Sequence, residues 1–580
     1  MGAPYDAALS NPTSASRVSA TPLEFPPLLV GGLLAAVAVF VVSLGGAHDF
    51  SHIDEHRYAE ISRVIASPGG DWLVPHLNGA IYHDKPPLFF WIAALAQRLG
   101  IGLPAAAIVP AQLGAAAALL ATFGIARRLA GLPAALASLV LLATGVRFAS
   151  FAGRANLDAL LMGFVAVALY AFVRRETTAE RNASRNWFAC GCLAAGLGVL
   201  VKGPIAIAIP GVTIVASRLL EGRGKSLLSA WVPAALALSL LPVSVWLAAA
   251  GQHVGWDYVS RIVVHHALEH ALGRVMHAGV PWDYLRIFPV AFLPGALLLP
   301  AAFASLPRRW PLARFDAFAL AWFCGGVLLL SLFPVKRHHY LMPLYPGAAL
   351  FVARMATPTG ERLLRERRVA LALLTTGRVA IAGLGAALGA ALLVAALLVG
   401  LGVDPTAPFA ATKGARIWQL IAAASPRKIA LGAALGMLAL TGAFLAVRAA
   451  SNPRRALGLA LAALAATIAQ ARVVEAVLDP GREKRAFLES VASVVGVGAI
   501  ADYGGMHYAA NWVLRRDVVA VLGDAASAAR FVAANEPQPS FVLVDRENLD
   551  RKGIPPGMQV RIEWPRPLAT DLVLLEPTGH

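Results

Sequence analysis

Cysteine is nearly missing from this sequence. Its three cysteines, Cys190, Cys192 and Cys324, all fall inside apolar segments. Disulfide frameworks and zinc knuckles need several cysteines at regular spacing, so this scarcity excludes both. We interpret the three thiols as small buried apolar side chains.

Charged residues are scarce as well. They make up 14% of the chain, whereas 58% of the residues are hydrophobic and the mean hydropathy is +0.65. Soluble proteins are about 45 to 50% apolar and about 25% charged, so this composition indicates a polytopic membrane protein. The formal charge of +17 is typical of cationic cytoplasmic loops, and no nucleic-acid partner is expected. From Gly481 onward there are 11 Lys plus Arg against 12 Asp plus Glu, so the basic excess belongs to the membrane part.

Residues 1–26 lack the apolar core and small-residue cleavage site of a signal peptide, and we expect a loose cytoplasmic tail. Apolar runs of about 17 to 25 residues then predict transmembrane helices, because each is long enough to cross a bilayer core. About thirteen apolar runs occur between residues 27 and 480, of which the fifth, sixth and tenth are shorter than this. Their approximate bounds are 27–46, 105–126, 133–149, 157–173, 187–201, 204–217, 228–249, 284–304, 316–334, 341–355, 378–401, 429–447 and 456–477.

Charge asymmetry orients these helices. With the N-terminus in the cytoplasm every predicted inner loop is basic, as at Arg127 and Arg128, which is the positive-inside pattern. The same orientation puts residues 48–87 and 252–283 outside, and an odd number of helices puts residues 481–580 there too. One outer loop, 404–428, is basic against this rule.

Two short segments and the C-terminal region complete the predicted architecture. Residues 57–65 and 88–99 are too short to span, and we expect amphipathic helices in the outer interface. Residues 481–580 alternate helical and strand patterns and predict a soluble α/β domain, without a glycine-rich phosphate loop or a catalytic triad signature.

One polar stretch, residues 48–87, interrupts the apolar sequence. Asp54, Glu55 and Arg57 lie near its start, and Lys85 lies at its end before two prolines. Ionisable groups beside a bilayer are costly unless they are solvated, paired or used in function. We therefore predict a catalytic loop at the membrane surface, although Asp54 and Glu55 can also be read as an exposed acidic pair.

Two further polar residues stand at predicted helix ends. Asp158 follows Arg154 and Asn156, which favours a polar pocket, while the alternative is an Asp that complements a helix N-terminus. Lys202 precedes Gly203 and Pro204, where backbone N–H groups of the next helix can face an anion. The alternative for Lys202 is a lysine whose ammonium reaches back to water.

The segment 334–346 (PVKRHHYLMPLYP) is basic and aromatic. Cations and phenols at the outer interface suit a phosphate site, and anchoring to anionic headgroups is the alternative. The residues concerned are Lys336, Arg337, His338, His339, Tyr340 and Tyr345.

The outer loop 252–283 is rich in histidine. His265 and Glu269 are four residues apart, as are His266 and His270, so on a helix each pair shares one face and can ligate a metal. No recognised metal signature completes the set. A divalent metal ion is therefore a candidate cofactor, and no other cofactor is expected.

Several of these segments resemble the bacterial aminoarabinose transferases that modify lipid A, membrane glycosyltransferases of the C type that are related to protein O-mannosyltransferases. The resemblance covers about residues 27–480 and rests on the segments HIDEHRYAE, YHDKPPLFFW, 154–158, VKGP and KRHHYLMPLYP. It implies transfer of a sugar, 4-amino-4-deoxy-L-arabinose, from undecaprenyl phosphate to lipid A on the periplasmic face of the bacterial inner membrane. His56 stands where the commonest family pattern has a smaller residue.

The resemblance also implies roles for residues. Asp54 would be the principal acidic residue and Asp158 would assist, with Glu55 as a further catalytic candidate. Lys85 and Tyr345 would hold the carrier phosphate. The other candidates for binding that phosphate, several of them as cations, are Arg57, Tyr82, Lys202, Arg337, His338 and His339.

The acceptor decides whether the reaction needs a base. A lipid A phosphate is already anionic near neutral pH, because a phosphate monoester has its second pKa near about 6. A Ser or Thr hydroxyl would instead require Asp54 to act as a base. A transporter would place ionisable residues near the membrane midplane, and a scaffold would need no such constellation.

Overall fold

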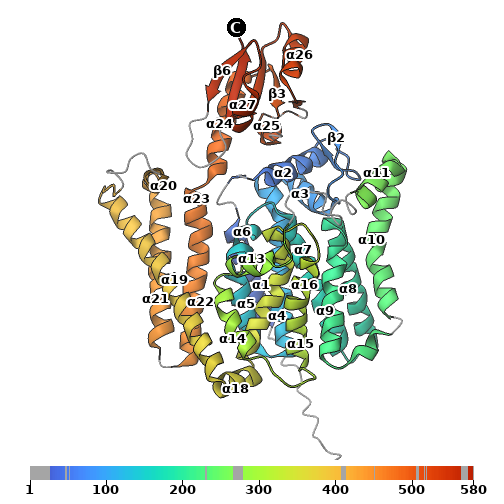
Figure 1. The fold of residues 1–580 in the computed structure, drawn as a ribbon, viewed down its shortest axis with the longest axis vertical. Helices are drawn as coiled ribbons and strands as arrows, with labels where there is room; N and C mark the ends of the chain where they lie inside the picture. The colour runs from blue at the N-terminus through green and yellow to red at the C-terminus, as the bar shows by residue number, and fades with distance from the viewer. Residues whose placement is uncertain are drawn as a thin grey trace, which may run out of the picture.

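The computed structural model describes residues 27–45, 49–50, 52–228, 231–265, 279–405, 413–449, 451–504, 508–514, 516, 519–563 and 572–578. Figure 1 shows a helical bundle and, at one end of it, a small domain that contains a β-sheet. Helix α24 (Pro480–Val495) leads from the bundle into this domain. The end of the bundle that faces the domain is called the domain end below.

Eight helices in the described part are long and apolar enough to cross a membrane, and two bent pairs raise the number to as many as ten. The bent pairs are α5 (Leu132–Ala143) with α6 (Val146–Ala152), at 67°, and α13 (Asp283–Ala291) with Gly295–Ala304, at 111°. The eight are α4 (Ala105–Leu129), α7 (Leu157–Thr177), α8 (Arg181–Lys202), α10 (Trp231–Val254), α15 to α16 (Arg314–Ser331), α19 (Arg368–Gly400), α21 (Pro426–Arg448) and α22 to α23 (Asn452–Val477).

The remaining three predicted spans correspond to shorter helices. These are α1 (Pro27–Leu44), α9 (Ile205–Leu220) and α17 (Tyr345–Ala353). All nine residues of α17 are buried inside the protein, so its apolar run serves the core. Each predicted segment is thus helical, but the number thirteen stays a prediction, because a full crossing needs about 20 helical residues.

The loop between α1 and α4 is folded at the domain end (Figure 1). Helix α2 (Ile53–Ala66) buries Tyr58, Ile61 and Ile65 on one face, and α3 (Leu88–Arg98) packs beside it. The two predicted short helices are therefore confirmed, while their place in the membrane interface stays a prediction. Between them lies a hairpin of β1 (His76–Leu77) and β2 (Ala80–Ile81).

The small domain is a mixed five-stranded sheet with helices on both faces. Its strand order is β4-β3-β5-β7-β6, in which β4, β3 and β5 are parallel and β7 pairs antiparallel with β5 and β6. Alternate residues of β5 enter different cores, Leu543 on one face and Val544 on the other. The elements are β3 (Ala499–Tyr503), α25 (Tyr508–Val513), β4 (Ala520–Leu522), α26 (Ala525–Asn535), β5 (Ser540–Asp545), α27 (Arg546–Lys552), β6 (Met558–Glu563) and β7 (Leu572–Pro577).

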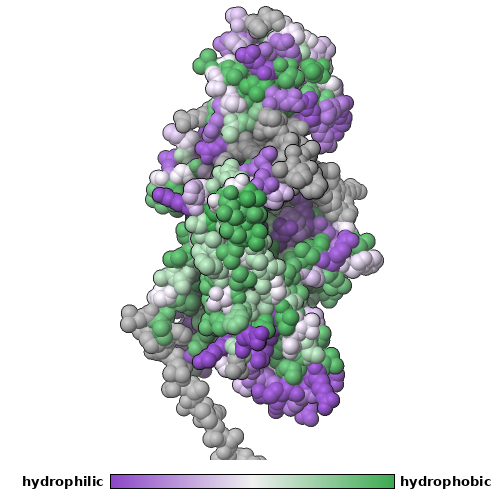
Figure 2. All heavy atoms as spheres, turned by 90° about the vertical axis from the view of Figure 1, so that its left-hand side faces the viewer, coloured by the Kyte–Doolittle hydropathy of each residue, from purple (hydrophilic) through white to green (hydrophobic). Residues whose placement is uncertain are grey.

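The bundle surface is apolar around its middle. Figure 2 shows a broad hydrophobic area over the bundle, with hydrophilic residues gathered below it and on the small domain above it. Large apolar side chains are exposed on the outer helices, for example Val245 of α10 and Leu397 of α19. Such a surface suits contact with lipid chains, as expected of a multi-pass membrane protein.

Candidate active site

Asp158 and Lys202 form the most tightly paired charges at the domain end. The Lys202 Nζ lies 2.6 Å from both carboxylate oxygens of Asp158, which is almost fully buried. Asp158 is not needed as a cap for α7, because the Asn156 side chain accepts hydrogen bonds from the N–H groups of Asp158 and Ala159. The carboxylate is therefore available for Lys202, which is paired and does not reach back to water.

Local sequence explains how Lys202 reaches this position. It is the last residue of α8, and Gly203 follows with a φ of 81°, a conformation that favours glycine. Pro204 then precedes α9. The Lys202 ammonium also lies 4.3 Å from the centre of the Tyr340 ring, in the segment η5 (His338–Leu344). One lysine thus connects the start of α7, the end of α8 and η5.

The start of α2 is held by a reciprocal cap. His52 accepts a hydrogen bond from the Asp54 N–H, and the Glu55 carboxylate accepts one from the His52 N–H. Glu55 is also buried and lies 3.6 Å from Arg154, which in turn pairs with Glu475. These contacts show a structural use of Glu55, and its catalytic role stays a prediction.

Arg57 lies between two carboxylates of the predicted catalytic loop. Its guanidinium is 3.5 Å from Asp54 and 3.8 Å from Asp84. Burial raises the pKa of Tyr82, and the charge of Asp84 adds to this effect, while the neighbouring Arg57 opposes it. The ion pair with Arg57 orients Asp54. The binding of a carrier phosphate by Arg57 stays a prediction.

Lys85 lies close to the same charges. The pKa of its ammonium is lowered to about 8, mainly by burial and then by the Lys202 cation, while the charges of Asp84 and Asp54 oppose the shift. Its Nζ donates a hydrogen bond to the Asp84 carbonyl at 2.9 Å. The fold therefore brings Lys85 and Lys202 close to the carboxylates of Asp54 and Asp158, although these residues are far apart in the sequence.

The two adjacent histidines of η5 lie against aromatic rings, His338 stacked and His339 edge-on. The His338 ring lies 5.7 Å from that of Phe151, and the His339 ring lies 4.9 Å from that of Tyr340. Burial lowers the pKa of His339 to about 2, with Lys202 as the next cause, and burial also lowers the pKa of His338. Lowered pKa values favour the neutral form of both imidazoles. Binding of the carrier phosphate by His338 and His339 stays a prediction.

Three other residues of the basic segment differ in their surroundings. Lys336 donates hydrogen bonds to the carbonyls of Leu330 and Ser331 and so closes the end of α16 (Gly326–Ser331). Arg337 lies near His339, whose pKa it lowers. The Tyr345 ring is fully buried, and among the described residues its hydroxyl has no hydrogen-bond partner. A buried hydroxyl without a partner is an available donor.

Sequence reasoning missed Arg147, the second residue of α6. It lies 6.0 Å from the Phe151 ring and contributes to lowering the pKa of His338. Arg147 was overlooked because it lies near the end of a predicted apolar helix. A lone arginine in an apolar run is nevertheless a signal of function. Asp84 was missed too, although it lies between the candidates Tyr82 and Lys85 in the sequence.

The predicted metal site lies largely outside the described residues. His266, Glu269 and His270 belong to a segment that is not described, and the same holds for the side chain of His265. Among the residues that are described, no group of three or more His, Cys, Asp or Glu is placed to hold a metal ion. The divalent metal ion therefore stays a prediction.

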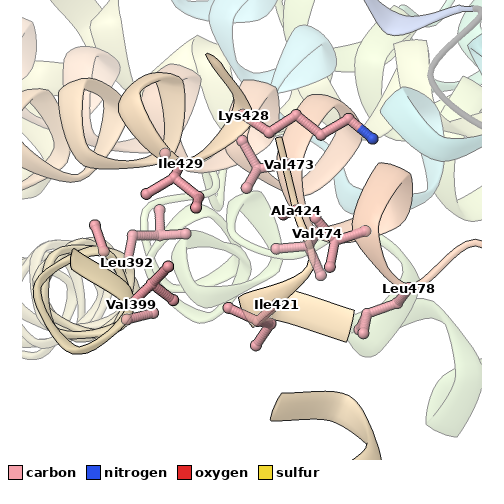
Figure 3. Close-up of a pocket in the computed structure, with 13 residues that line it drawn as sticks. Leu392, Val399, Ile421, Ala424, Lys428, Ile429, Val473, Val474 and Leu478 are labelled. Carbon is pink, nitrogen blue, oxygen red and sulfur yellow. The ribbon is translucent and has the colours of Figure 1, made fainter. Parts of the chain in front are cut away.

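A separate cavity of about 100 Å³ lies between α19, α20 (Lys413–Ala422), α21 and the segment 473–478. Figure 3 shows apolar side chains such as Leu392 and Val474 around it, with the Lys428 ammonium directed away from them. That ammonium donates to the Ala476 carbonyl. Lys428 is the one ionisable residue of this lining and its ammonium is engaged by that carbonyl, so the charge cluster around Asp158 is the better candidate.

Known proteins resemble this chain in sequence. Residues 84–248 match the family model described as dolichyl-phosphate-mannose-protein mannosyltransferase. The chain is 31% identical over 313 residues to the undecaprenyl phosphate-alpha-4-amino-4-deoxy-L-arabinose arabinosyl transferase of Edwardsiella ictaluri, covering 53% of this chain and 56% of that protein. It is also 31% identical over 328 residues to the enzyme of the same name from Pseudomonas aeruginosa, covering 55% and 58%. The chain thus matches little more than half the length of these relatives.

The fold is shared over a longer stretch. The crystal structure of ArnT from Cupriavidus metallidurans bound to undecaprenyl phosphate aligns with a TM-score of 0.71 at 18% identity, covering 95% of this chain and 98% of that one. Its apo structure aligns with a TM-score of 0.69. At 18% identity this likeness shows that the chain has the fold of that structure, while the sequence matches show similarity to the aminoarabinose transferases over little more than half their length.

Proposed function

We propose that this protein transfers 4-amino-4-deoxy-L-arabinose from undecaprenyl phosphate to a lipid A phosphate. The observation that carries the proposal is the cluster in which Lys85 and Lys202 lie with Asp54 and Asp158 at the domain end. Clustered cations suit a phosphate, and carboxylates suit an amino sugar. The names of the sequence relatives agree with this donor and this sugar.

The reaction breaks the bond between the anomeric carbon of the sugar and an oxygen of the carrier phosphate. The electron pair stays on that oxygen, and an oxygen of the acceptor phosphate forms the new bond. Lys85 would stabilise the charge that grows on the leaving phosphate, with Tyr345 as a hydroxyl donor. Arg337, Arg147 and Lys202 would add positive potential nearby.

The carboxylates would act on the sugar. Asp54 is half-buried and held by Arg57, so it is placed to bind the ammonium of the amino sugar or to stabilise positive charge on the ring. Asp158 would act mainly by fixing Lys202. No base is needed, because the acceptor phosphate is already ionised.

A second candidate is transfer to a Ser or Thr hydroxyl, which the description of the matched family model favours. In that case Asp54 would remove the proton of the hydroxyl. Purified protein should be offered the undecaprenyl-linked amino sugar with either lipid A or a Ser- and Thr-containing peptide, and the products weighed by mass spectrometry. A lipid A product supports our proposal, a modified peptide supports the second candidate, and an unchanged lipid A with active wild-type donor turnover refutes the first.

We also propose the orientation and location. The protein would lie in the bacterial inner membrane with thirteen crossings, its N-terminus in the cytoplasm and residues 481–580 in the periplasm. The basic loops at Arg127 and Arg174 support this, because positive loops stay in the cytoplasm.

A further inference from the structure

The small domain forms hydrogen bonds with the turn of the hairpin β1–β2. Asn78, in the turn, donates a hydrogen bond from its amide nitrogen to the Val519 carbonyl at 2.8 Å. Its amide oxygen accepts hydrogen bonds from the Val519 N–H at 2.7 Å and from the Asn511 side chain at 3.0 Å. One side chain thus satisfies both backbone groups of a buried residue in the small domain.

The turn is built to present this side chain. Asn78 has a φ of 52° and Gly79 a φ of 77°, so both adopt the left-handed conformation that a two-residue hairpin turn requires. Asn and Gly are the residues that tolerate it best. The hairpin runs directly into Tyr82, Asp84 and Lys85, so the position of its tip affects the position of the lysine.

The same domain also contacts α2. The Trp512 indole N–H donates to the His56 ring at 3.4 Å, and the two rings are stacked. The Tyr508 ring lies 5.5 Å from the Arg57 guanidinium, which pairs with Asp54. Tyr508, Asn511 and Trp512 all belong to the short helix α25.

We propose that α25 and Val519 form a clamp that holds the hairpin preceding Lys85 in register with the helix carrying Asp54. Asn511 and Trp512 of the clamp, and Asn78 of the hairpin turn, are then positioning residues, and the small domain is a working part of the active site. The inference rests on the proposed transfer function, since it assigns roles relative to Asp54 and Lys85.

Register matters because the two groups act on opposite ends of one bond. A misplacement of about 1 Å of a catalytic group can lower a rate about a hundredfold. Asp54 belongs to α2, whereas Lys85 lies in the segment between β2 and α3. A domain that contacts both segments at once can fix their separation.

The decisive variant is Asn78→Gly. Glycine keeps the left-handed turn and removes only the side chain that makes the three hydrogen bonds. We expect kcat to fall about tenfold or more, with a much smaller change in KM. Asn78→Asp keeps the acceptor oxygen and should restore part of kcat. Trp512→Phe, which loses the indole N–H and keeps a smaller aromatic ring, should lower kcat less.

The matched control is Asn548→Ala, which removes an amide that binds the Gly504 carbonyl inside the same domain. It should lower the unfolding temperature and leave kcat unchanged. If Asn78→Gly behaves in the same way, the contact is merely structural and the proposal is wrong. Should Asn78→Gly not fold, Asn511→Ala removes one bond from the domain side and is judged by the same criterion.

Hydrogen exchange separates this inference from the proposed function. In Asn78→Gly, amides of residues 76–85 and of α2 should exchange faster, with no change in α7 or α8. Unchanged exchange refutes the clamp whatever the activity. If exchange rises as expected but wild-type protein transfers no sugar, the proposed function fails and the clamp, as a structural contact, does not.

Discussion

Asp54 is the residue whose charge we expect to matter most for the reaction. Asp54→Asn keeps the size of the side chain and removes its charge, so transfer should fall about a hundredfold or more, on the scale of about 2.7 to 4 kcal/mol for one preorganised group. The measurement is kcat of purified, folded variant against wild type. Near-normal turnover would show that the charge of Asp54 plays no part.

The lowered pKa of Lys85 predicts how kcat/KM depends on pH. Its lowered pKa of about 8 means that the ammonium is charged below pH 8 and becomes neutral above it. If the charged form holds the carrier phosphate, kcat/KM should decline above about pH 8. Lys85→Arg should lose this decline because a guanidinium stays protonated, even if its planar shape lowers the rate. An equally steep decline in Lys85→Arg would mean that another group titrates.

Carrier binding separates the roles of the two residues. Lys85→Ala should weaken retention of undecaprenyl phosphate in detergent, whereas Asp54→Asn should retain it, because only the lysine is expected to contact the phosphate. Loss of the carrier in Asp54→Asn together with its retention in Lys85→Ala would reverse the two assignments.

At the scale of elements, the pair of Asp158 and Lys202 ties α7 to α8. Removing one partner leaves the other charge buried without compensation, which costs about 3 to 5 kcal/mol in soluble proteins. Lys202→Met should therefore lower the unfolding temperature more than the double variant Asp158→Asn with Lys202→Met. Additive effects in this double-mutant cycle would show that the two side chains do not interact.

The bent pairs show how elements depart from the pattern of the sequence. The apolar run 133–149 predicts one straight crossing, but α5 ends at Ala143 and α6 turns away by 67°. This bend directs Arg147 toward the neighbourhood of His338. Hydropathy reports the presence of such a segment and contains no information about its bend.

At the scale of the whole molecule, the orientation is open to a direct test. A cysteine placed at Pro480 should react with an impermeant thiol reagent added outside intact spheroplasts, and one at Ser184 should not, because Ser184 belongs to a basic loop that we place in the cytoplasm. The natural cysteines are first replaced by alanine or serine. Labelling of Ser184→Cys from outside would overturn the thirteen-crossing topology.

The sequence alone determined the membrane-type helical fold, the two short helices at the domain end and the segments that carry Asp54, Lys85, Asp158 and Lys202. Composition, helical periodicity and hydropathy depend on neighbours along the chain, so they can be read without a structure. The alternating helical and strand patterns of residues 481–580 can be read for the same reason, and β5 and β7 are two of the strands found there.

Only the tertiary structure decided which charges meet. Asn78 and Val519 are 441 residues apart, and Asp158 and Lys202 are 44 apart, so no local pattern predicts these contacts. The lowered pKa of His339 depends on burial and on Lys202, and both arise only when η5 packs against the helix ends. Burial and long-range proximity are properties of the folded chain, and they set the pairing and the ionisation of its polar groups.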